Sequence, residues 1–392
     1  MSFVRRAYAI SIVPIIAIFL ALLLGSVLII ISSVIQGKLN VALPLVAYES
    51  LFQGATGISF LDVKGQTITF AFTFDPERSY RALSATMQAA APLVLTGLAV
   101  GVGFKGGLFN IGGTGQVLVG GFTAALVGAA VATQPAPIAI TIAVAAGALG
   151  GALYGFIPGA LKAFTGAHEV VVTIMLNSLA AFVIVGLVND IFKITGPTFA
   201  RTADVGNATL PVILGRDGSL GILIALVCVP IAYVLIYRTT LGFEIRTVGE
   251  NPSAARYAGM SPRSLIILTM SLCGLFAGLA GAIVILGQGY YPAVFGTTIG
   301  FTGITVALLG RAHPVGILLA ALLLGGMEAG APAMQITAKV PAEIIGVIQG
   351  LILLFLAAEV LIRSTFRIRA GRDTPTAAEL TTVSASYGSG QA

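Results

Sequence analysis

Long apolar stretches separated by short polar segments dominate this chain. The hydrocarbon core of a bilayer is about 30 Å thick, so a spanning helix needs about 20 mostly apolar residues. The pattern therefore predicts ten membrane-spanning segments, near residues 9–31, 83–104, 108–132, 137–161, 170–188, 219–237, 264–287, 295–310, 314–331 and 342–362. The segment at 295–310 is short and follows Gly289-Tyr290-Tyr291-Pro292, so we expect a half-helix or a re-entrant piece there.

The composition agrees with a membrane protein. Hydrophobic residues make up 57% of the chain and charged residues only 9%, against roughly 25% charged residues in an ordinary soluble domain. Cys228 and Cys273 lie inside apolar runs, and His168 and His313 are far apart, so we expect no disulfide scaffold, no metal site and no cofactor. The net charge of +6 is scattered between the apolar runs, which argues against a nucleic-acid partner.

The fold class that follows is an all-α polytopic membrane bundle of about ten transmembrane helices. Residues 1–32 are interpreted as an N-terminal anchor helix, because the apolar run behind Arg5 and Arg6 is longer than the 7–15 residues of a signal-peptide core. Placing both termini in the cytoplasm divides the 21 Lys and Arg residues 13 inside to 8 outside, as the positive-inside rule favours.

Polar segments divide the chain further. Residues 33–80 are expected to form an extracytoplasmic loop, in which the alternation at 66–73 predicts a strand or hairpin. Residues 81–365 form the main transmembrane domain, with a second outer loop at 189–218 and a cytoplasmic loop at 238–263. Residues 366–392 are rich in Ser, Thr, Ala and Gly without apolar periodicity, which predicts a disordered cytoplasmic tail.

A glycine-rich junction lies between the second and third predicted spans, at residues 103–116. Its six glycines would each destabilise a continuous helix by about 1 kcal/mol relative to Ala, so the helix is expected to break there. Transporters place substrate sites at such breaks, whereas small residues also serve close helix packing, and the residues leave both interpretations open. Asn110 and Gln116 favour a polar path, because a buried amide needs a hydrogen-bond partner in lipid.

Other polar residues inside or beside the spans are candidates for the same path. Glu169 and Asn177 share a helix face, but Glu169 lies near the cytoplasmic end and fits a helix-start role better. Glu328 is the most expensive residue to insert, at roughly 2.5–3.5 kcal/mol. The candidate substrate path comprises Asn110, Gln116, Asn177, Gln288, Thr298, Thr302 and Glu328.

The cytoplasmic loop contains a predicted short helix. Asn251 is a candidate N-cap, Pro252 suits the first helical position, and Gly259 can end the helix in a left-handed conformation. With small residues on one face, this helix is suited to dock in a groove of another protein, although a membrane-surface helix is the alternative. The candidate docking residues are Gly242, Glu244, Arg246, Gly249, Asn251, Ala254, Ala255, Tyr257 and Gly259.

Three separate motifs resemble one family. They are residues 104–112 (FKGGLFNIG), residues 166–177 (GAHEVVVTIMLN) and residues 242–259 (GFEIRTVGENPSAARYAG), which occur in this order in the bacterial ABC importer permeases of the branched-chain amino acid/ribose superfamily. The chain looks most similar to the nucleoside or simple-sugar branch of that superfamily over roughly residues 80–365. Gly113 and Thr114 stand where relatives often carry Ala-Glu, which puts the substrate in doubt.

The resemblance implies an assembly. It would contain a second, related permease in a heterodimer, ABC ATPase subunits and an extracytoplasmic solute-binding lipoprotein in the bacterial cell membrane. Residues 242–259 would form the coupling helix on which the ATPase acts.

Three classes of function are open to a polytopic membrane protein. No GxxxxGK[ST] stretch occurs, so ATP hydrolysis would belong to a partner and this chain would not be an enzyme. A proton- or sodium-coupled secondary transporter of a small polar solute is the alternative, but it would be expected to carry more ionisable residues inside its spans. A membrane enzyme would need a catalytic constellation, and none is recognisable. The sequence therefore predicts an ABC importer permease for a small neutral polar solute, most simply a nucleoside or a sugar.

Overall fold

The computed structural model describes residues 2–35, 40–64, 67–194, 199–295 and 298–358. Its elements are α1 (Ser2–Ile35), α2 (Leu43–Thr56), β1 (Ile58–Lys64), β2 (Thr67–Phe74), α3 (Pro76–Lys105), α4 (Gly113–Ala130), α5 (Ala136–Thr165), α6 (Glu169–Asp190), η1 (Gly206–Ala208), β3 (Val212–Leu214), β4 (Gly218–Ser219), α7 (Gly221–Arg238), α8 (Thr240–Glu250), α9 (Pro252–Tyr257), α10 (Pro262–Gln288), α11 (Ile299–Leu309), α12 (Pro314–Ala338) and α13 (Glu343–Ala357). The predicted tail at 366–392 lies outside the described residues.

Eight of these helices are long and apolar enough to cross a membrane: α1 from Ile12, α3, α4, α5, α6, α7, α10 and α12. Two further apolar helices, α11 and α13, are shorter, with 11 and 15 residues. The polytopic helical bundle expected from the sequence is confirmed, including the short segment near 295–310. The last predicted span, 342–362, corresponds to α13, which begins at Glu343, and residues 359–362 lie outside the described part of the chain.

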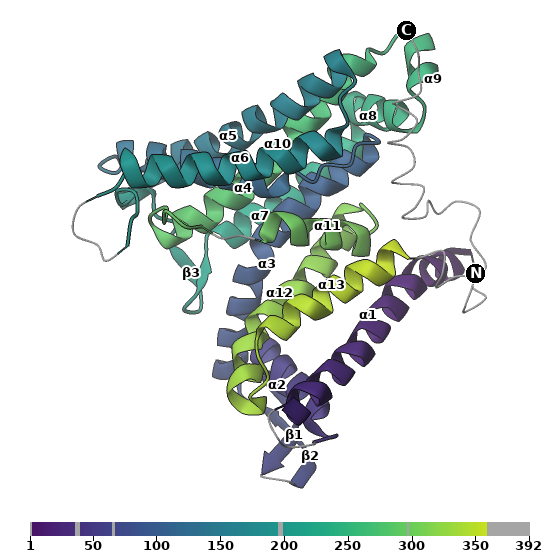
Figure 1. The fold of residues 1–392 in the computed structure, drawn as a ribbon, viewed down its shortest axis with the longest axis vertical. Helices are drawn as coiled ribbons and strands as arrows, with labels where there is room; N and C mark the ends of the chain where they lie inside the picture. The colour runs from purple at the N-terminus through teal and green to yellow at the C-terminus, as the bar shows by residue number, and fades with distance from the viewer. Residues whose placement is uncertain (1, 36–39, 65–66, 195–198, 296–297, 359–392) are drawn as a thin grey trace. The chain divides into compact units, whose positions relative to one another are not determined.

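The chain divides into two compact units, and α3 and α12 each contribute to both. The first unit contains residues 1–90, 214–218 and 322–379. Within it α1 lies beside α13 (Figure 1), and a methyl group at Gly25 would lie 2.8 Å from Ile348. The Tyr48 hydroxyl of α2 donates a 2.7 Å hydrogen bond to the carbonyl of Leu22, which anchors α2 to the middle of α1.

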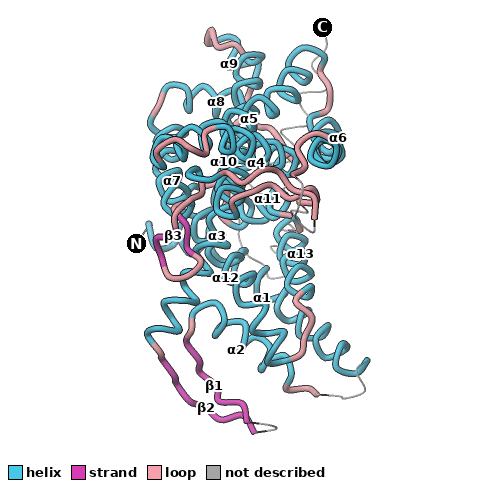
Figure 2. Tube along the Cα trace, turned by 90° about the vertical axis from the view of Figure 1, so that its left-hand side faces the viewer, coloured by secondary structure: helices cyan, strands magenta, loops and turns pink. Residues whose placement is uncertain are grey.

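The hairpin predicted near residues 66–73 is present in the first unit. Strands β1 and β2 pair antiparallel (Figure 2), with Ile58 opposite Phe74 and Lys64 opposite Thr67. The Glu49 carboxylate of α2 accepts hydrogen bonds from the backbone amides of Phe60, at 2.6 Å, and Leu61, at 3.2 Å. This side chain fixes the start of the hairpin onto α2.

Glycines bring three helices of the second unit into backbone contact. This unit contains residues 91–213, 219–321 and 380–392, and α4, α5 and α10 form its densest packing. A methyl group at Gly278 would overlap the carbonyl oxygen of Gly147, and one at Gly281 would overlap that of Val117. Association of apolar helices in lipid depends on such close approach, because lipid is as apolar as the side chains.

Residues 202–210 of the predicted 189–218 loop run beside the last turn of α10 and the residues that follow it. Three backbone hydrogen bonds of 2.9–3.0 Å join the two segments. The amide of Thr202 donates to the carbonyl of Tyr291, that of Val205 to Gly289, and that of Leu210 to Leu286. The Tyr291 ring is buried and contacts Phe122 edge-on, with the centroids 5.6 Å apart. These contacts order the part of the predicted 189–218 loop that follows residue 198.

Candidate functional site

The helix break predicted at 103–116 lies between α3 and α4. Helix α3 ends at Lys105, and Gly107 adopts a φ of +68°, a left-handed conformation that favours glycine. The amides of Gly106 and Leu108 both donate to the carbonyl of Gly103 at 2.9 Å, which satisfies the last turn of α3. Residues 106–112 therefore cross the second unit without regular helical hydrogen bonds, and side-chain amides supply the missing partners.

Two buried side-chain amides bind each other at this break. The Asn110 Nδ2 donates to Gln116 Oε1 at 3.0 Å, and Asn110 Oδ1 accepts from the backbone amide of Gly112 at 2.9 Å. Both side chains are about 1% exposed. Buried polar groups without partners are costly in lipid, so this pairing stabilises the irregular backbone.

Asn177 of α6 joins the two sides of the break. Its Nδ2 donates to the carbonyl of Ile111 at 2.9 Å, and its Oδ1 accepts from the amide of Gly115 at 2.7 Å. One side chain thus satisfies an acceptor before α4 and a donor in its first turn, where helix amides lack partners. The structure brings together Asn110, Gln116 and Asn177, three of the residues that the sequence singled out.

The start of α11 reaches the same place. A methyl group at Gly300 would overlap the amide nitrogen of Thr114, and one at Gly113 would lie 3.1 Å from the Gly300 carbonyl oxygen. Thr302, one turn into α11, is buried, whereas Thr298 is exposed. The N-termini of two apolar helices therefore meet at Gly113 and Gly300, and both lie next to irregular backbone.

Two further path candidates belong to other helices. Gln288 is the last residue of α10 and is exposed. Glu328 belongs to the part of α12 in the first unit, where Gln349 of α13 is its neighbour. The structure therefore groups the three amides around the break, whereas Thr302, Gln288 and Glu328 belong to α11, α10 and α12.

The predicted docking loop contains two helices where the sequence had indicated one. The expected helix is α9, in which the Asn251 side chain accepts from the amide of Ala254 at 3.0 Å as an N-cap. Helix α8 precedes it and begins at the N-cap Thr239, whose hydroxyl accepts from the amide of Gly242 at 3.0 Å. The signal for α8 was available in the spacing of its buried face, Leu241, Ile245 and Val248.

Helix α8 packs directly on the helix break. A methyl group at Gly249 would lie 2.5 Å from the carbonyl oxygen of Lys105 and 2.8 Å from the backbone of Gly106 and Gly107. A methyl group at Gly106 would in turn lie 3.3 Å from the Ile245 side chain. Because the Gly249 contact is between backbones, a displacement of α8 acts there on the end of α3 without a flexible side chain between them.

The small residues of this loop do not all face outward. Ala255 is fully buried in a cluster with Ile245, Val248 and Leu265, and Gly249 is buried against the break. The surface of the loop is instead formed by Phe243, Glu250, Asn251, Ala254, Arg256 and Tyr257, of which Tyr257 is 96% exposed. Gly249 and Ala255 are therefore packing positions, whereas Ala254 and Tyr257 are available to a partner.

A cluster of cations and aromatic rings adjoins α8, and the sequence did not indicate it. The Tyr237 ring lies 5.4 Å from the Arg246 guanidinium carbon and 6.0 Å from Lys105 Nζ. The His313 ring contacts Tyr237 at 5.6 Å and Tyr233 at 5.9 Å. Burial, and secondarily the charge of Lys105, lower the pKa of His313 below its ordinary value.

Glu169 forms a buried ion pair near the start of α6. Its Oε2 lies 2.6 Å from Lys162 Nζ, and the two side chains are 0% and 6% exposed. The helix-start interpretation of Glu169 is consistent with its place in the first turn of α6. The pair joins α5 to α6 across the turn at Gly166, whose φ is +69°.

These features define a polytopic membrane protein with a broken helix stabilised by amides. Residues 82–357 match the family described as the permease component of branched-chain amino acid transport systems. The chain belongs to this family and is an ABC transporter permease.

Three members of this family of permeases are similar to this chain in sequence. The guanosine ABC transporter permease protein NupP of Bacillus subtilis is 44% identical over 71% of this chain and 81% of its own. The nucleoside ABC transporter permease protein NupB of Lactococcus lactis is 34% identical over 89% and 91%. The glucose ABC transporter permease protein TsgB13 of Haloferax volcanii is 35% identical over 70% and 75%. No solved structure matches the chain.

Proposed function

We propose that this chain is the permease subunit of a nucleoside importer, driven through α8 and α9 by a partner ATPase. The observation that carries the proposal is the backbone contact between Gly249 of α8 and the end of α3 at Lys105. Closure of the ATPase would press on the exposed face of the loop and displace α8. Because α8 rests on the helix break, the displacement would change the backbone that lines the substrate path.

The chemistry of the break supports a neutral polar solute. Asn110, Gln116 and Asn177 offer amide donors and acceptors without fixed charge, which suits the base and hydroxyl groups of a nucleoside. In the described conformation these amides bind each other and the backbone, so solute would exchange with those bonds when α4 and α6 separate. Two relatives named for guanosine or nucleoside transport favour a nucleoside, and one named for glucose keeps a sugar as second candidate.

The proposed assembly follows from the family. Relatives occur as named pairs in one organism, such as NupP with NupQ in Bacillus subtilis. We propose a heterodimer with a second, related permease, two ABC ATPase subunits and an extracytoplasmic solute-binding lipoprotein in the bacterial inner membrane. Both chain termini and the 238–263 loop would face the cytoplasm.

Uptake into proteoliposomes tests the proposal. The complex would be purified through this chain, reconstituted with its binding protein, and supplied with labelled guanosine, uridine or glucose. We expect nucleoside uptake that requires ATP inside the liposomes. The partner subunits would hydrolyse this ATP, because no ATP-binding loop occurs in this chain. Uptake by this chain alone under a proton or sodium gradient would overturn the proposal in favour of a secondary transporter.

A further inference from the structure

Exposed phenylalanine side chains gather on one face of the hairpin in the first unit. Phe70, Phe72 and Phe74 of β2 are 81%, 63% and 54% exposed. Because successive side chains of a strand point to opposite faces, these three rings share one face. The strand contains no charged residue. Contiguous exposed apolar surface of this kind marks a place that meets a membrane or another protein.

Ring contacts extend this surface onto α2, beside the hairpin (Figure 2). The ring centroid of Phe72 lies 5.8 Å from that of Phe60 on β1, and Phe60 lies 5.6 Å from Phe52 on α2. Phe52 is exposed, and so is Leu45, which is seven residues earlier on the same side of α2. The aromatic face is therefore formed by Leu45, Phe52, Phe60, Phe70, Phe72 and Phe74.

Helix α2 lies beside the membrane spans of this unit. Its Tyr48 hydroxyl donates to the carbonyl of Leu22, which is about 20 Å before the end of α1 along the helix axis. A methyl group at Gly330 would overlap the carbonyl oxygen of Leu51, and Gly330 is about 12 Å before the end of α12. A bilayer is about 40–45 Å thick with its headgroups, so α2 lies within the depth of the membrane.

We propose that the aromatic face is seated in the lipid bilayer and anchors the hairpin at the membrane surface. Phenylalanine and leucine on the apolar side of an interfacial element enter the boundary between headgroups and acyl chains by about 5–10 Å. Directly after Phe74 the chain carries the exposed charges Asp75, Glu77, Arg78 and Arg81, which suit headgroups and water. The change from rings to charges sets the depth of the hairpin.

The Glu49 carboxylate keeps the two parts of the aromatic face together. It accepts hydrogen bonds from the Phe60 amide at 2.6 Å and from the Ser59 hydroxyl at 3.0 Å. Ser59 pairs with Thr73, whose side chain points away from the face of Phe72 and Phe74. The polar side of the hairpin is thus bound to α2, and its phenylalanines are left free for lipid.

A solute-binding protein is the other candidate partner for this surface. It would approach from water and would meet the hairpin only in the assembled importer. Leu45 and Phe52 continue the aromatic face along α2, beside spans that lipid surrounds, and this continuity favours the bilayer.

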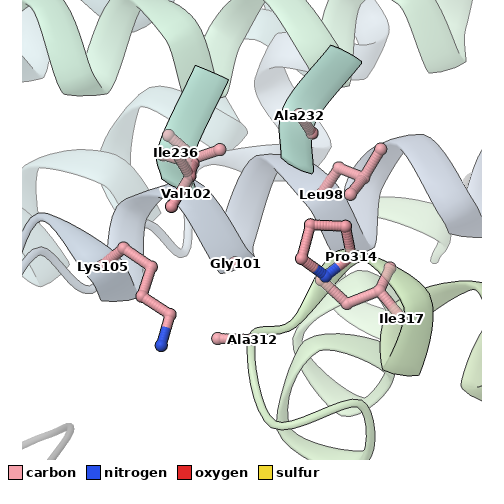
Figure 3. A pocket seen from close by; sticks show the side chains of 9 residues that line it. All are labelled: Leu98, Gly101, Val102, Lys105, Ala232, Ile236, Ala312, Pro314 and Ile317. Atoms are coloured by element: carbon pink, nitrogen blue, oxygen red, sulfur yellow. The ribbon is translucent and has the colours of Figure 1, made fainter. Parts of the chain in front are cut away.

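A surface site also has the room that lipid needs. The apolar pocket between the end of α3, α7 and the turn before α12 (Figure 3) has room for about one water molecule, so it admits neither acyl carbons nor a solute. The aromatic face needs no cavity, because lipid can surround exposed rings.

Single-tryptophan variants test the anchor, because the chain contains no tryptophan. Phe70→Trp and Phe72→Trp place a reporter on the aromatic face. Thr73→Trp, also exposed but on the opposite side of β2, is the matched control. Each variant would be checked for a monodisperse gel-filtration profile and reconstituted in phosphatidylcholine liposomes, with or without bromine on the acyl chains near the headgroups.

Contact with bromine quenches tryptophan fluorescence. We expect Phe70→Trp and Phe72→Trp to emit at shorter wavelength than Thr73→Trp and to lose fluorescence in the brominated lipid. Thr73→Trp should keep its fluorescence there and lose it to iodide in the water. Phe52→Trp, which leaves the hairpin sequence unchanged, is a second reporter and should behave like Phe72→Trp.

Two results would overturn the anchor. One is quenching of all the variants by iodide with none by brominated lipid. The other is a blue shift of Phe72→Trp that appears only when solute-loaded binding protein is added, which would assign the face to that protein. Quenching reports contact with lipid on either side of the membrane, so the result is independent of the proposed solute and of coupling to ATP.

Discussion

Gly249 of α8 lies so close to Lys105 of α3 that a methyl group on the glycine would be 2.5 Å from the lysine carbonyl oxygen. The contact is between backbones, and no rotamer change can relieve an added side chain. It links the loop proposed to meet the ATPase with the helix break proposed to line the substrate path. Predictions about coupling follow from this contact and from the amides behind it.

Gly249→Ala is expected to separate α8 from the helix break. Overpacking of this kind typically lowers the free energy of unfolding by about 1–3 kcal/mol. ATP-driven uptake should fall by more than the loss of stability alone would cause, because α8, which the substitution displaces, transmits the motion of the ATPase. Thermal unfolding in detergent and ATP-driven uptake in proteoliposomes measure the two effects.

The control for that variant is Gly186→Ala in α6. No atom lies within 4 Å of the methyl group it introduces, so helix propensity alone should raise stability by up to about 1 kcal/mol. If Gly249→Ala transports and melts like Gly186→Ala, the backbone contact does not couple the two elements.

Tyr257→Ala tests the outer face of the same loop. The Tyr257 side chain is 96% exposed, so its removal should change the melting temperature little. ATP hydrolysis by the reconstituted complex should lose its stimulation by solute-loaded binding protein if this ring contacts the ATPase.

Ala255→Leu is expected to differ, because Ala255 is fully buried and the variant should destabilise the fold. Unchanged stimulation in Tyr257→Ala would exclude the ring from the docking face.

Local signals in the sequence were sufficient for most of the fold. Apolar length predicted the spans, and the glycines between Gly103 and Gly113 predicted the break. Local capping contributes as well: the Oδ1 of Asp75, which directly precedes α3, accepts from the amide of Glu77 at 3.0 Å. Helix α8 was not predicted, although the spacing of Leu241, Ile245 and Val248 carried a local signal for it.

Asn177→Asp should weaken the helix break while keeping the size of the side chain. The substitution removes the donor to the Ile111 carbonyl and places a carboxylate beside that oxygen, although the acceptor for the Gly115 amide remains. Loss of one partner in a buried pair costs about 1–3 kcal/mol. Uptake and the melting temperature should both fall.

Asn189→Asp on the same helix provides the comparison. Asn189 is exposed, and its Nδ2 bonds only locally, to the carbonyl of Val185 at 2.9 Å. Equal melting temperatures for Asn177→Asp and Asn189→Asp would mean that the amide does not stabilise the break.

Some contacts of the candidate site could not be predicted from the sequence and are visible only in the folded structure. The sequence singled out Asn110, Gln116 and Asn177 because a buried amide needs a partner. Asn110 and Gln116 bind each other locally, but Asn177 binds Gly115 and Ile111 across 62 and 66 residues of the chain. Lys105 and Arg246 come to the ring of Tyr237 where the ends of α3 and α7 meet α8, and no local pattern encodes that meeting. Close contacts between distant elements are a property of packing.

Glu169→Gln is expected to destabilise the second unit strongly. It would leave the Lys162 ammonium buried without its carboxylate, and breaking a buried pair from one side costs about 3–5 kcal/mol. Glu77→Gln is the matched control, because it breaks the exposed pair with Arg81 and should change stability by at most about 1 kcal/mol. Chemical denaturation of both variants would decide, and equal stabilities would show that the buried pair contributes little.

His313 should make stability fall at acidic pH. Burial and the charge of Lys105 lower the folded-state pKa below the ordinary value of 6.5, so on acidification the unfolded chain binds the proton first. The stabilisation is therefore present above about pH 6.5, the unfolded value, and is lost as the pH falls from there through the folded value. The difference in melting temperature between pH 7.5 and pH 5.5 should shrink in His313→Gln, which keeps a polar side chain but cannot titrate. An identical acid response in the unchanged protein and in His313→Gln would assign the pH dependence to another group.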